Sequence, residues 1–185
     1  DAPFTQQNCK PGHPETEVGN MGRRTRVIGN VYDPTREISY SRGNLSFTSI
    51  NLPRLAIESN HDEKLFYQKL DKMMELVAQQ LLDRFEIQAS KRVYNYPFLM
   101  GQGVWLDSEK LGPNDEVREV LKHGTLSIGF IGLAETLTAL YGHHHGESDE
   151  MEKKGLEIIA HMRKFCDSKS QEMHMNFTLL GTPAE

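Results

Sequence analysis

The stretch Gly43-Asn44-Leu45-Ser46-Phe47-Thr48-Ser49-Ile50-Asn51-Leu52 decides the fold, because it reads as a β-strand from Asn44 to Leu52. Successive side chains of a strand point to opposite faces. Both faces mix apolar and hydroxyl-bearing side chains, with Leu45, Phe47 and Ser49 on one face and Ser46, Thr48 and Ile50 on the other. This mixture is expected of a strand that lines a site on one of its sides.

A long helix is predicted after this strand. Asn60 and Glu63 have the spacing of a capping box, in which two side chains satisfy the free amides at a helix start. Apolar residues then recur at helical spacing, namely Phe66, Leu70, Met73, Val77, Leu81 and Phe85. We interpret the segment as an amphipathic helix that packs on the core, with Met73 and Met74 filling gaps.

Three further elements are expected towards the end of the sequence. The segment Ile128 to Tyr141 is apolar nearly all round and predicts a buried helix, with Gly142 as its stop. Ser148 begins another helix, whose apolar face includes Cys166, and we expect this cysteine to be buried and inert. A short strand from Asn176 to Leu180 follows.

The remaining segments read mainly as loops. Residues 1–22 and Pro97 to Leu106 are predicted loops, and Arg24 to Val31 is a predicted strand. Asn114 can cap a short helix. Strands that alternate with helices indicate a mixed α/β architecture, although the pattern does not by itself specify a barrel.

The composition is that of an ordinary globular protein of 185 residues, with 25% charged and 37% hydrophobic side chains. The net charge of −5 and the lack of a basic block argue against nucleic-acid binding. No apolar run approaches the roughly 20 residues that span a bilayer, and the first residues do not resemble a signal peptide. With only Cys9 and Cys166, no disulfide framework is expected, and a reducing cytoplasm fits best.

The sequence is expected to be a piece of a larger protein. It starts without Met and ends on Gly181-Thr182-Pro183-Ala184-Glu185, which reads as the opening of a helix. Thr182 suits the N-cap, Pro183 the first helical position and Glu185 the acidic position of a capping box. Such a turn exposes amides that favour an anion such as phosphate, although turns of this kind are common.

Three other features invite a functional interpretation, and the residues alone leave each one open. Glu135 is a carboxylate in an otherwise apolar segment, where catalytic use and a satisfied structural role are both compatible with it. Asn44, taken alone, would be a turn residue at a strand start. The run His143-His144-His145 lies in a glycine-flanked turn, where metal binding, a polar loop near a site and a solvated loop are alternatives.

Several long stretches carry a resemblance that covers nearly the whole chain. They are Met21-Gly22 with Arg24-Thr25-Arg26, then Gly43 to Arg54, Gly124 to Glu135, His144 to Glu147, and Asn176-Phe177 through Thr182-Pro183-Ala184-Glu185. In these stretches the chain resembles the class III anaerobic ribonucleotide reductases, which are glycyl-radical enzymes. The resemblance implies that residues 1–185 form a single segment, the central portion of a ten-stranded α/β barrel, without the family's N-terminal allosteric and C-terminal glycyl-radical regions.

The resemblance also implies a reaction, which is the reduction of ribonucleoside triphosphates to deoxyribonucleotides by thiyl and glycyl radicals. It implies that formate or a thiol system supplies electrons, and that the parent protein has a structural zinc site elsewhere, a radical-SAM activating enzyme and a homodimeric state. No cofactor or metal is assigned to this segment, and no nucleic acid or membrane is expected as a partner. The unpaired strand edges of an excised piece would favour self-association.

Carried over residue by residue, the radical-bearing cysteine of the family motif Met-Gly-Cys-Arg-Thr falls on Arg23. A guanidinium has no S–H bond and brings a permanent charge, so the segment is predicted to be inactive. Asn44 matches the position that contacts the substrate ribose and suggests the formate-using subgroup. Ser46 and Glu135 are assigned to substrate binding, and the phosphates are assigned to Thr182, Pro183, Ala184 and Glu185.

Two other interpretations remain beside this one. The first is a related glycyl-radical enzyme with other chemistry, against which the Asn44 stretch and the terminal turn argue, because a nucleotide needs a phosphate cradle. The second is a non-catalytic nucleotide-binding or interaction module that has lost its cysteine. Ligand titration would separate the second from a reductase.

Overall fold

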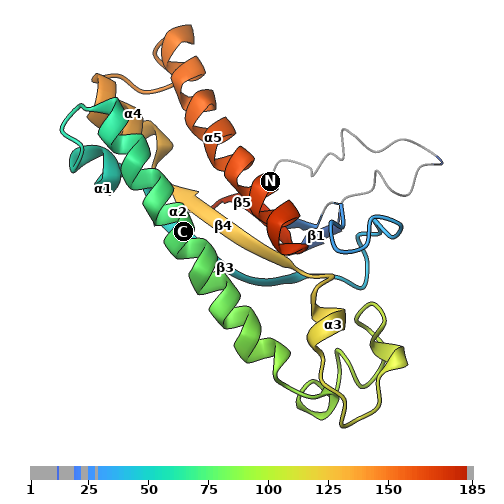
Figure 1. The fold of residues 1–185 in the computed structure, drawn as a ribbon. Coiled ribbons are helices and arrows are strands. Elements are labelled where there is room, and N and C mark those ends of the chain that lie inside the picture. Colours follow the sequence, from blue (N-terminus) through green and yellow to red (C-terminus); the bar gives the residue numbers. More distant parts are fainter. Residues whose placement is uncertain (1–11, 13–18, 22–24, 28, 183–185) are drawn as a thin grey trace. The chain divides into compact units, whose positions relative to one another are not determined.

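A computed structural model describes residue 12 and the ranges 19–21, 25–27 and 29–182, with backbone alone for the two short ranges (Figure 1). The elements, in chain order, are β1 (Gly19–Met21), β2 (Thr25–Val27), β3 (Asn44–Asn51), α1 (Leu52–Ile57), α2 (Glu63–Ala89), the 3₁₀ turns η2 (Val93–Asn95) and η3 (Ser108–Lys110), α3 (Arg118–Leu121), β4 (Thr125–Ile131), α4 (Leu133–Tyr141), α5 (Asp149–Met173) and β5 (Asn176–Gly181).

The chain divides into two compact units, each assembled from three stretches of sequence. The first unit comprises Asp1–Ser46, Arg84–Leu126 and Met173–Asn176. The second unit comprises Phe47–Asp83, Ser127–Glu172 and Phe177–Glu185. Strands β3, β4 and β5 therefore begin in the first unit and continue in the second.

These three strands form a sheet in the order β3-β4-β5. The Thr125 amide donates to the Gly43 carbonyl (2.9 Å) where β3 and β4 begin, and the Thr182 amide donates to the Phe130 carbonyl (2.9 Å) where β4 and β5 end. Neighbouring strands are joined by helical connections, as parallel strands must be. The mixed α/β architecture predicted from the sequence is thus confirmed, with a parallel sheet at its centre.

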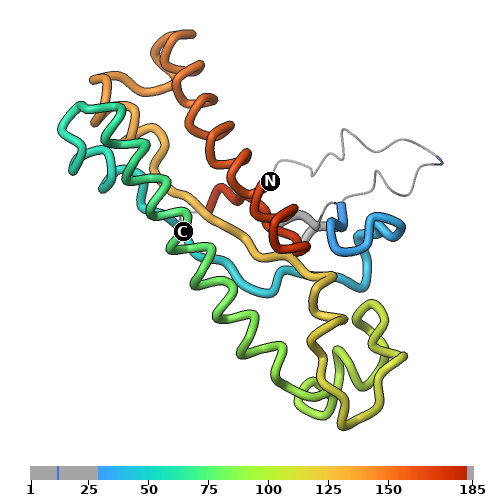
Figure 2. The backbone as a smooth tube through the Cα atoms, viewed as in Figure 1, coloured from blue at the N-terminus to red at the C-terminus, as the bar shows by residue number. Residues whose placement is uncertain are grey.

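Helices α2 and α5 lie side by side within the second unit. Near the start of both helices, Lys154 of α5 pairs with Glu63 of α2 (3.0 Å), and further along both, Lys169 of α5 pairs with Glu75 of α2 (3.0 Å). The two helices therefore run parallel to each other. Figure 2 shows the two helices running in the same direction. Helices that contact each other in this way cover the same face of the sheet.

The core of the second unit lies between these helices and the sheet. The apolar face predicted for α2 is confirmed, except that Met74 is fully buried whereas Met73 is only half-buried. Burial of side chains of this size stabilises a fold by roughly 1.5–3 kcal/mol each. The largest fully buried side chains of this unit are Ile50, Leu52, Phe66, Leu70, Met74, Leu81, Ile128, Leu137, Ile158 and Met162.

The helix predicted from Ile128 to Tyr141 is wrong in its first part. Residues up to Ile131 belong to β4, and α4 begins only at Leu133, after Gly132 in the left-handed conformation (φ +74°). A parallel strand that is buried on both faces reads as a near-continuous apolar run, and periodicity cannot distinguish such a run from a buried helix. The predicted stop at Gly142 is confirmed, with a φ of +86°.

Of the N-caps predicted for the two long helices, one is wrong and one is confirmed. Asn60 does not cap α2, because it has a φ of +46°, and the Asp62 carboxylate accepts the Leu65 amide instead (2.9 Å). Ser148 does cap α5, since its hydroxyl accepts the Met151 amide (3.3 Å). The prediction for Asn60 is wrong because Asp62, two residues later, is also a good N-cap residue and accepts a backbone amide of the first helical turn.

The predictions for the smaller elements are also corrected in part. Asn114 does not cap α3, which begins at Arg118 without a side-chain cap. The loop predicted for residues 1–22 contains β1, which pairs antiparallel with β2. Of the strand predicted from Arg24 to Val31, only residues 25–27 are strand among those described, because the chain from residue 29 onward forms a loop.

Candidate functional site

The two faces of β3 have different surroundings. The Thr48 hydroxyl donates to the Gln80 side chain of α2 (2.9 Å), so Thr48 points to the helix-covered face. Ser49, the next residue, therefore points to the opposite face, where it is exposed. In β4, Ile128 is fully buried and Gly129 follows it. On the face opposite to the helices, β4 thus has a glycine at this position.

Two hydroxyl groups meet on this opposite face of the sheet. Ser49 of β3 and Thr182, directly after β5, lie on either side of β4, and their Oγ and Oγ1 atoms are 2.6 Å apart. Gly129 lies beneath this bond. A β-carbon at Gly129 would come within 2.7 Å of the Ser49 Oγ and closer still to the Thr182 Oγ1. The middle strand therefore requires glycine at this position.

A second hydroxyl pair lies on the same face. The Ser127 Oγ of β4 and the Thr178 Oγ1 of β5 are 2.8 Å apart. A bond between two hydroxyls uses only one of their two O–H groups. The Ser49–Thr182 bond therefore leaves one O–H and several lone pairs that can serve a polar or anionic ligand.

Of the predicted anion-binding turn Gly181 to Glu185, the described residues include Gly181, which ends β5, and Thr182. The Thr182 amide donates to the Phe130 carbonyl of β4 and its hydroxyl bonds to Ser49 of β3, so Thr182 is held by the neighbouring strand and by the strand beyond it. Pro183, Ala184 and Glu185 lie outside the described residues. Their assignment to substrate phosphates remains a prediction.

The prediction for Glu135 is wrong about its burial. It lies in the first turn of α4 and is exposed, so the expectation of a buried acid in an apolar helix is wrong. The segment is amphipathic once its first residues are assigned to β4. Pro53 of α1 packs against Gly132, and a β-carbon at Gly132 would lie 3.4 Å from the Glu135 carboxylate. The contact between α1 and α4 thus fixes the start of α4, which carries Glu135.

Asn44 and Ser46 lie in the first unit, whereas Glu135 and Thr182 lie in the second. The Thr125 hydroxyl donates to the Asn44 side-chain oxygen (3.2 Å), which holds the first residues of β3 and β4 together. Asn44 and Ser46 are both half-buried. Arg23 lies outside the described residues, so its predicted role is not tested.

The histidine-rich turn is an exposed loop in which two imidazoles contact a carboxylate of the same turn. His143, His144 and His145 are exposed, and the Glu147 carboxylate lies 2.8 Å from the His143 Nδ1 and 3.4 Å from the His144 Nε2. These contacts lower the pKa of Glu147, chiefly through the His144 amide and the His143 ring. In the part of the chain that the structure describes, no three metal-ligating side chains gather.

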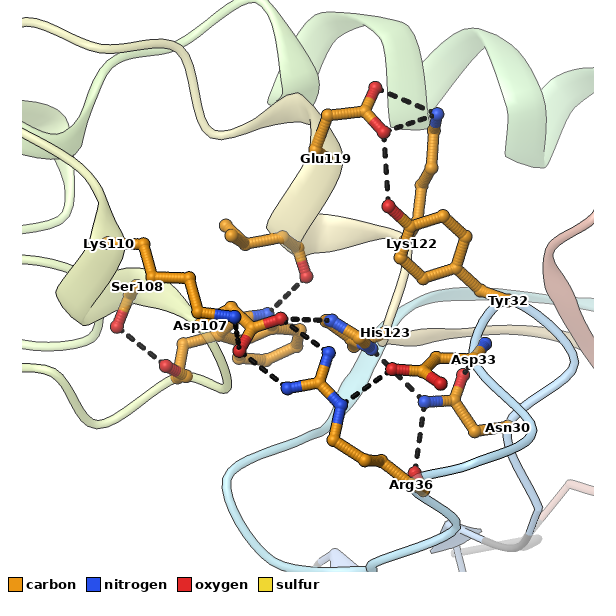
Figure 3. Close-up of polar contacts among 12 residues, drawn as sticks. Asn30, Tyr32, Asp33, Arg36, Asp107, Ser108, Lys110, Glu119, Lys122 and His123 are labelled. Atoms are coloured by element: carbon orange, nitrogen blue, oxygen red, sulfur yellow. Dashed lines mark hydrogen bonds and ion pairs between the residues drawn. The ribbon is translucent and has the colours of Figure 1, made fainter.

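A charged network in the first unit was not predicted from the sequence (Figure 3). The Arg36 guanidinium donates two hydrogen bonds to the Asp107 carboxylate, each 2.6 Å long. The His123 Nε2 lies 3.1 Å from the same carboxylate. The Asn30 amide donates to the His123 Nδ1 (3.1 Å), so the ring proton is on Nε2 and donates to Asp107. Chiefly because of Arg36, the pKa of Asp107 lies far below its usual range.

This network is suited to holding segments together. Burial lowers the pKa of His123 despite Asp107, so the ring is neutral near pH 7. Asn176, at the start of β5, accepts the Val31 amide (2.7 Å) and donates to the Gly124 carbonyl (3.1 Å) and to Asn30 (3.3 Å). The loop before β3 is thereby tied to the beginnings of β4 and β5.

Sequence reasoning missed Ser49 and Gly129 as parts of the site. The sequence did contain a sign that this segment is a strand with Gly129 on its polar side. Ser127 and Gly129 alternate with the apolar residues Leu126, Ile128 and Phe130 at the period of a strand. His123 and Asp107 gave no signal, since they lie 16 residues apart and only the tertiary fold brings them together.

Comparisons with known proteins agree with the resemblance. The family model for anaerobic ribonucleoside-triphosphate reductase matches residues 2–185. The enzyme of that name from Escherichia coli is 32% identical over 152 residues, which are 80% of this chain and 21% of that protein. The one from Haemophilus influenzae is 32% identical over 168 residues, which are 89% of this chain and 23% of that protein.

Solved structures show the same fold. The anaerobic ribonucleotide reductase from Thermotoga maritima with citrate in the active site aligns with a TM-score of 0.61 and 20% identity, over 78% of this chain and 25% of that one. The chain spans about a fifth to a quarter of the curated relatives' length. Among the described residues, no helix is long and apolar enough to cross a membrane. From the family match over almost every residue, we conclude that this chain belongs to the anaerobic ribonucleoside-triphosphate reductase family.

Proposed function

We propose that the chain forms part of the active-site barrel of an anaerobic ribonucleoside-triphosphate reductase, that its sheet contacts the nucleotide substrate, and that Arg23 prevents turnover. The observation that carries the proposal is the family match over residues 2–185, which includes every residue assigned to the site. The three parallel strands would be a portion of the family's ten-stranded barrel.

The geometry of the sheet supports a polar, anionic substrate. Helices cover one face, and the other face has the hydroxyl pairs Ser49–Thr182 and Ser127–Thr178 with Gly129 between them. A face of this kind is poorly suited to an apolar core and well suited to sugar hydroxyls and phosphate oxygens.

Each assigned residue has a role that follows from its chemistry. Asn44, with an amide side chain at the start of β3, would contact the ribose, with Ser46 two residues further along the strand. The turn from Thr182 to Glu185 would hold the phosphates on its amides. The exposed carboxylate of Glu135 is better suited to a ribose hydroxyl than to a phosphate, because like charges repel.

The residue at the radical position does not fit the family's chemistry. That chemistry requires a thiol at position 23, whereas this chain has an arginine there, which has no S–H hydrogen to release. We therefore derive no radical step for this chain. The glycyl radical, the reductant, the zinc site, the activating enzyme, the homodimer and the cytoplasmic location are proposed only for the parent protein.

The proposal is tested by calorimetric titration of the full-length protein with each ribonucleoside triphosphate and with the matching nucleoside. We expect weak binding of at least one triphosphate and weaker binding of its nucleoside, because the turn at Thr182 contacts the phosphates. The proposal is rejected if no triphosphate produces heat of binding while the protein is folded by circular dichroism.

A further inference from the structure

We propose that Ser49 is a positioning residue, whose hydroxyl fixes the Thr182 side chain across β4, and that position 129 is glycine to leave room for this bond. Only the purpose of the fixed side chain, which is to set the phosphate-binding turn, rests on the proposed function. The positioning itself rests on contacts within the second unit.

The first argument is the geometry of the bond. The distance of 2.6 Å between the two hydroxyl oxygens lies within the range of good O–H···O hydrogen bonds. It joins residues 133 positions apart, on strands that are not neighbours in the sheet. Two side chains on β3 and β5 can meet only where the strand between them has no side chain on that face, which is the case at Gly129.

The second argument is that Thr182 becomes fixed in two directions. Its amide donates to the Phe130 carbonyl of β4, and its hydroxyl bonds to Ser49 of β3. Threonine is branched at its β-carbon, so it has few side-chain rotamers, and one external bond is enough to select among them. Thr182, the last described residue after β5, is therefore held by both other strands of the sheet.

The third argument is that the Ser49–Thr182 bond leaves one hydroxyl of the pair able to donate a hydrogen bond to a ligand. Two hydroxyls supply two O–H donors, and their mutual bond uses one of them. The other remains available to a phosphate oxygen or to water. A turn fixed before its ligand arrives loses less conformational entropy on binding, which improves affinity without a new contact.

The test compares Ser49→Ala with two controls in the full-length protein. Ser49→Thr keeps the hydroxyl and should rescue the effect. Thr48→Val removes a hydroxyl from the adjacent residue on the helix-covered face, away from Thr182. Two readouts are measured: the Thr182 side-chain scalar couplings by NMR without ligand, and the dissociation constants of a ribonucleoside triphosphate and of its nucleoside.

We expect the Thr182 couplings to report one rotamer in the unaltered protein and rotamer averaging in Ser49→Ala. Triphosphate binding should weaken about fivefold in Ser49→Ala, the effect of one net hydrogen bond, while nucleoside binding stays the same. A single unchanged Thr182 rotamer in Ser49→Ala overturns the positioning role. Equal weakening for triphosphate and nucleoside overturns its link to the phosphates. Absence of triphosphate binding by the unaltered protein refutes the proposed function, and the couplings then decide the positioning role alone.

Discussion

At the scale of single residues, Gly129 is tightly constrained by side chains on the face of the sheet opposite to α2 and α5. Its neighbours on that face are the hydroxyls of Ser49 and Thr182, which leave no room for a β-carbon. In contrast, Gly155 in α5 would meet only ordinary contacts, at 3.4 Å or more, if it carried one. The same substitution should therefore have opposite effects at the two positions.

We predict that Gly129→Ala lowers the free energy of unfolding by about 1–3 kcal/mol, because overpacking forces its neighbours apart. The matched control Gly155→Ala should leave stability unchanged or raise it by up to about 1 kcal/mol, because alanine favours a helix interior over glycine. Urea unfolding followed by circular dichroism gives both values. Equal stability of Gly129→Ala and the unaltered chain would contradict the close approach of Ser49 and Thr182.

A second residue-scale prediction concerns Cys166, which is fully buried as the sequence predicted. Burial raises the pKa of its thiol to about 12, so almost no thiolate exists at neutral pH. We expect iodoacetamide at pH 8 to leave Cys166 unmodified in the folded chain and to modify it in denaturant, as measured by peptide mass spectrometry. Rapid alkylation in the folded chain would show that α5 does not bury this side chain.

At the scale of elements, the sequence predicted amphipathic segments correctly and failed on a segment buried on both faces. The helices α2 and α5 have one exposed face, so their apolar periodicity is visible. The strand β4 has no such face, and its apolar run continues into α4. Only Gly132, with its positive φ, separates the two elements, and one glycine does not reveal that break in a sequence.

The network that joins the loop before β3 to the starts of β4 and β5 should make stability depend on pH through His123. Burial lowers the pKa of His123 below its ordinary value near 6.5, so the unfolded chain binds the proton more readily than the folded one. The contribution of His123 is therefore present above about pH 6.5 and is lost as the pH falls below that value. Asp107, with its lowered pKa, loses its contribution only in stronger acid.

We predict that the free energy of unfolding of the unaltered chain falls more steeply between pH 7 and pH 5 than that of His123→Gln. His61→Gln is the control, because His61 is exposed and its ring bonds only to the Leu140 carbonyl among the described residues. Denaturant unfolding at a series of pH values supplies the slopes. Parallel slopes for the unaltered chain and His123→Gln would contradict a buried, neutral His123.

At the scale of the whole molecule, the long motifs predicted the family, which the match over residues 2–185 confirmed. The assembly of the site was less predictable. Asn44 and Thr182 are recognisable through motifs, whereas Ser49 and Gly129 acquire their role only from the order β3-β4-β5, which places a glycine between two hydroxyls. Strand order is a long-range property that no local pattern of side chains specifies.

The central proposal is that this chain is part of a nucleotide reductase and that the arginine at position 23 prevents its reaction. The most direct test of this proposal measures the deoxyribonucleotide that the full-length protein forms from a ribonucleoside triphosphate before and after Arg23→Cys. The assay is anaerobic and contains a family activating enzyme and formate or a thiol as the reductant, because the product is reduced relative to the substrate. We predict no product from the unaltered protein and measurable product from Arg23→Cys. Turnover by the unaltered protein, with Arg23 in place, would contradict the account.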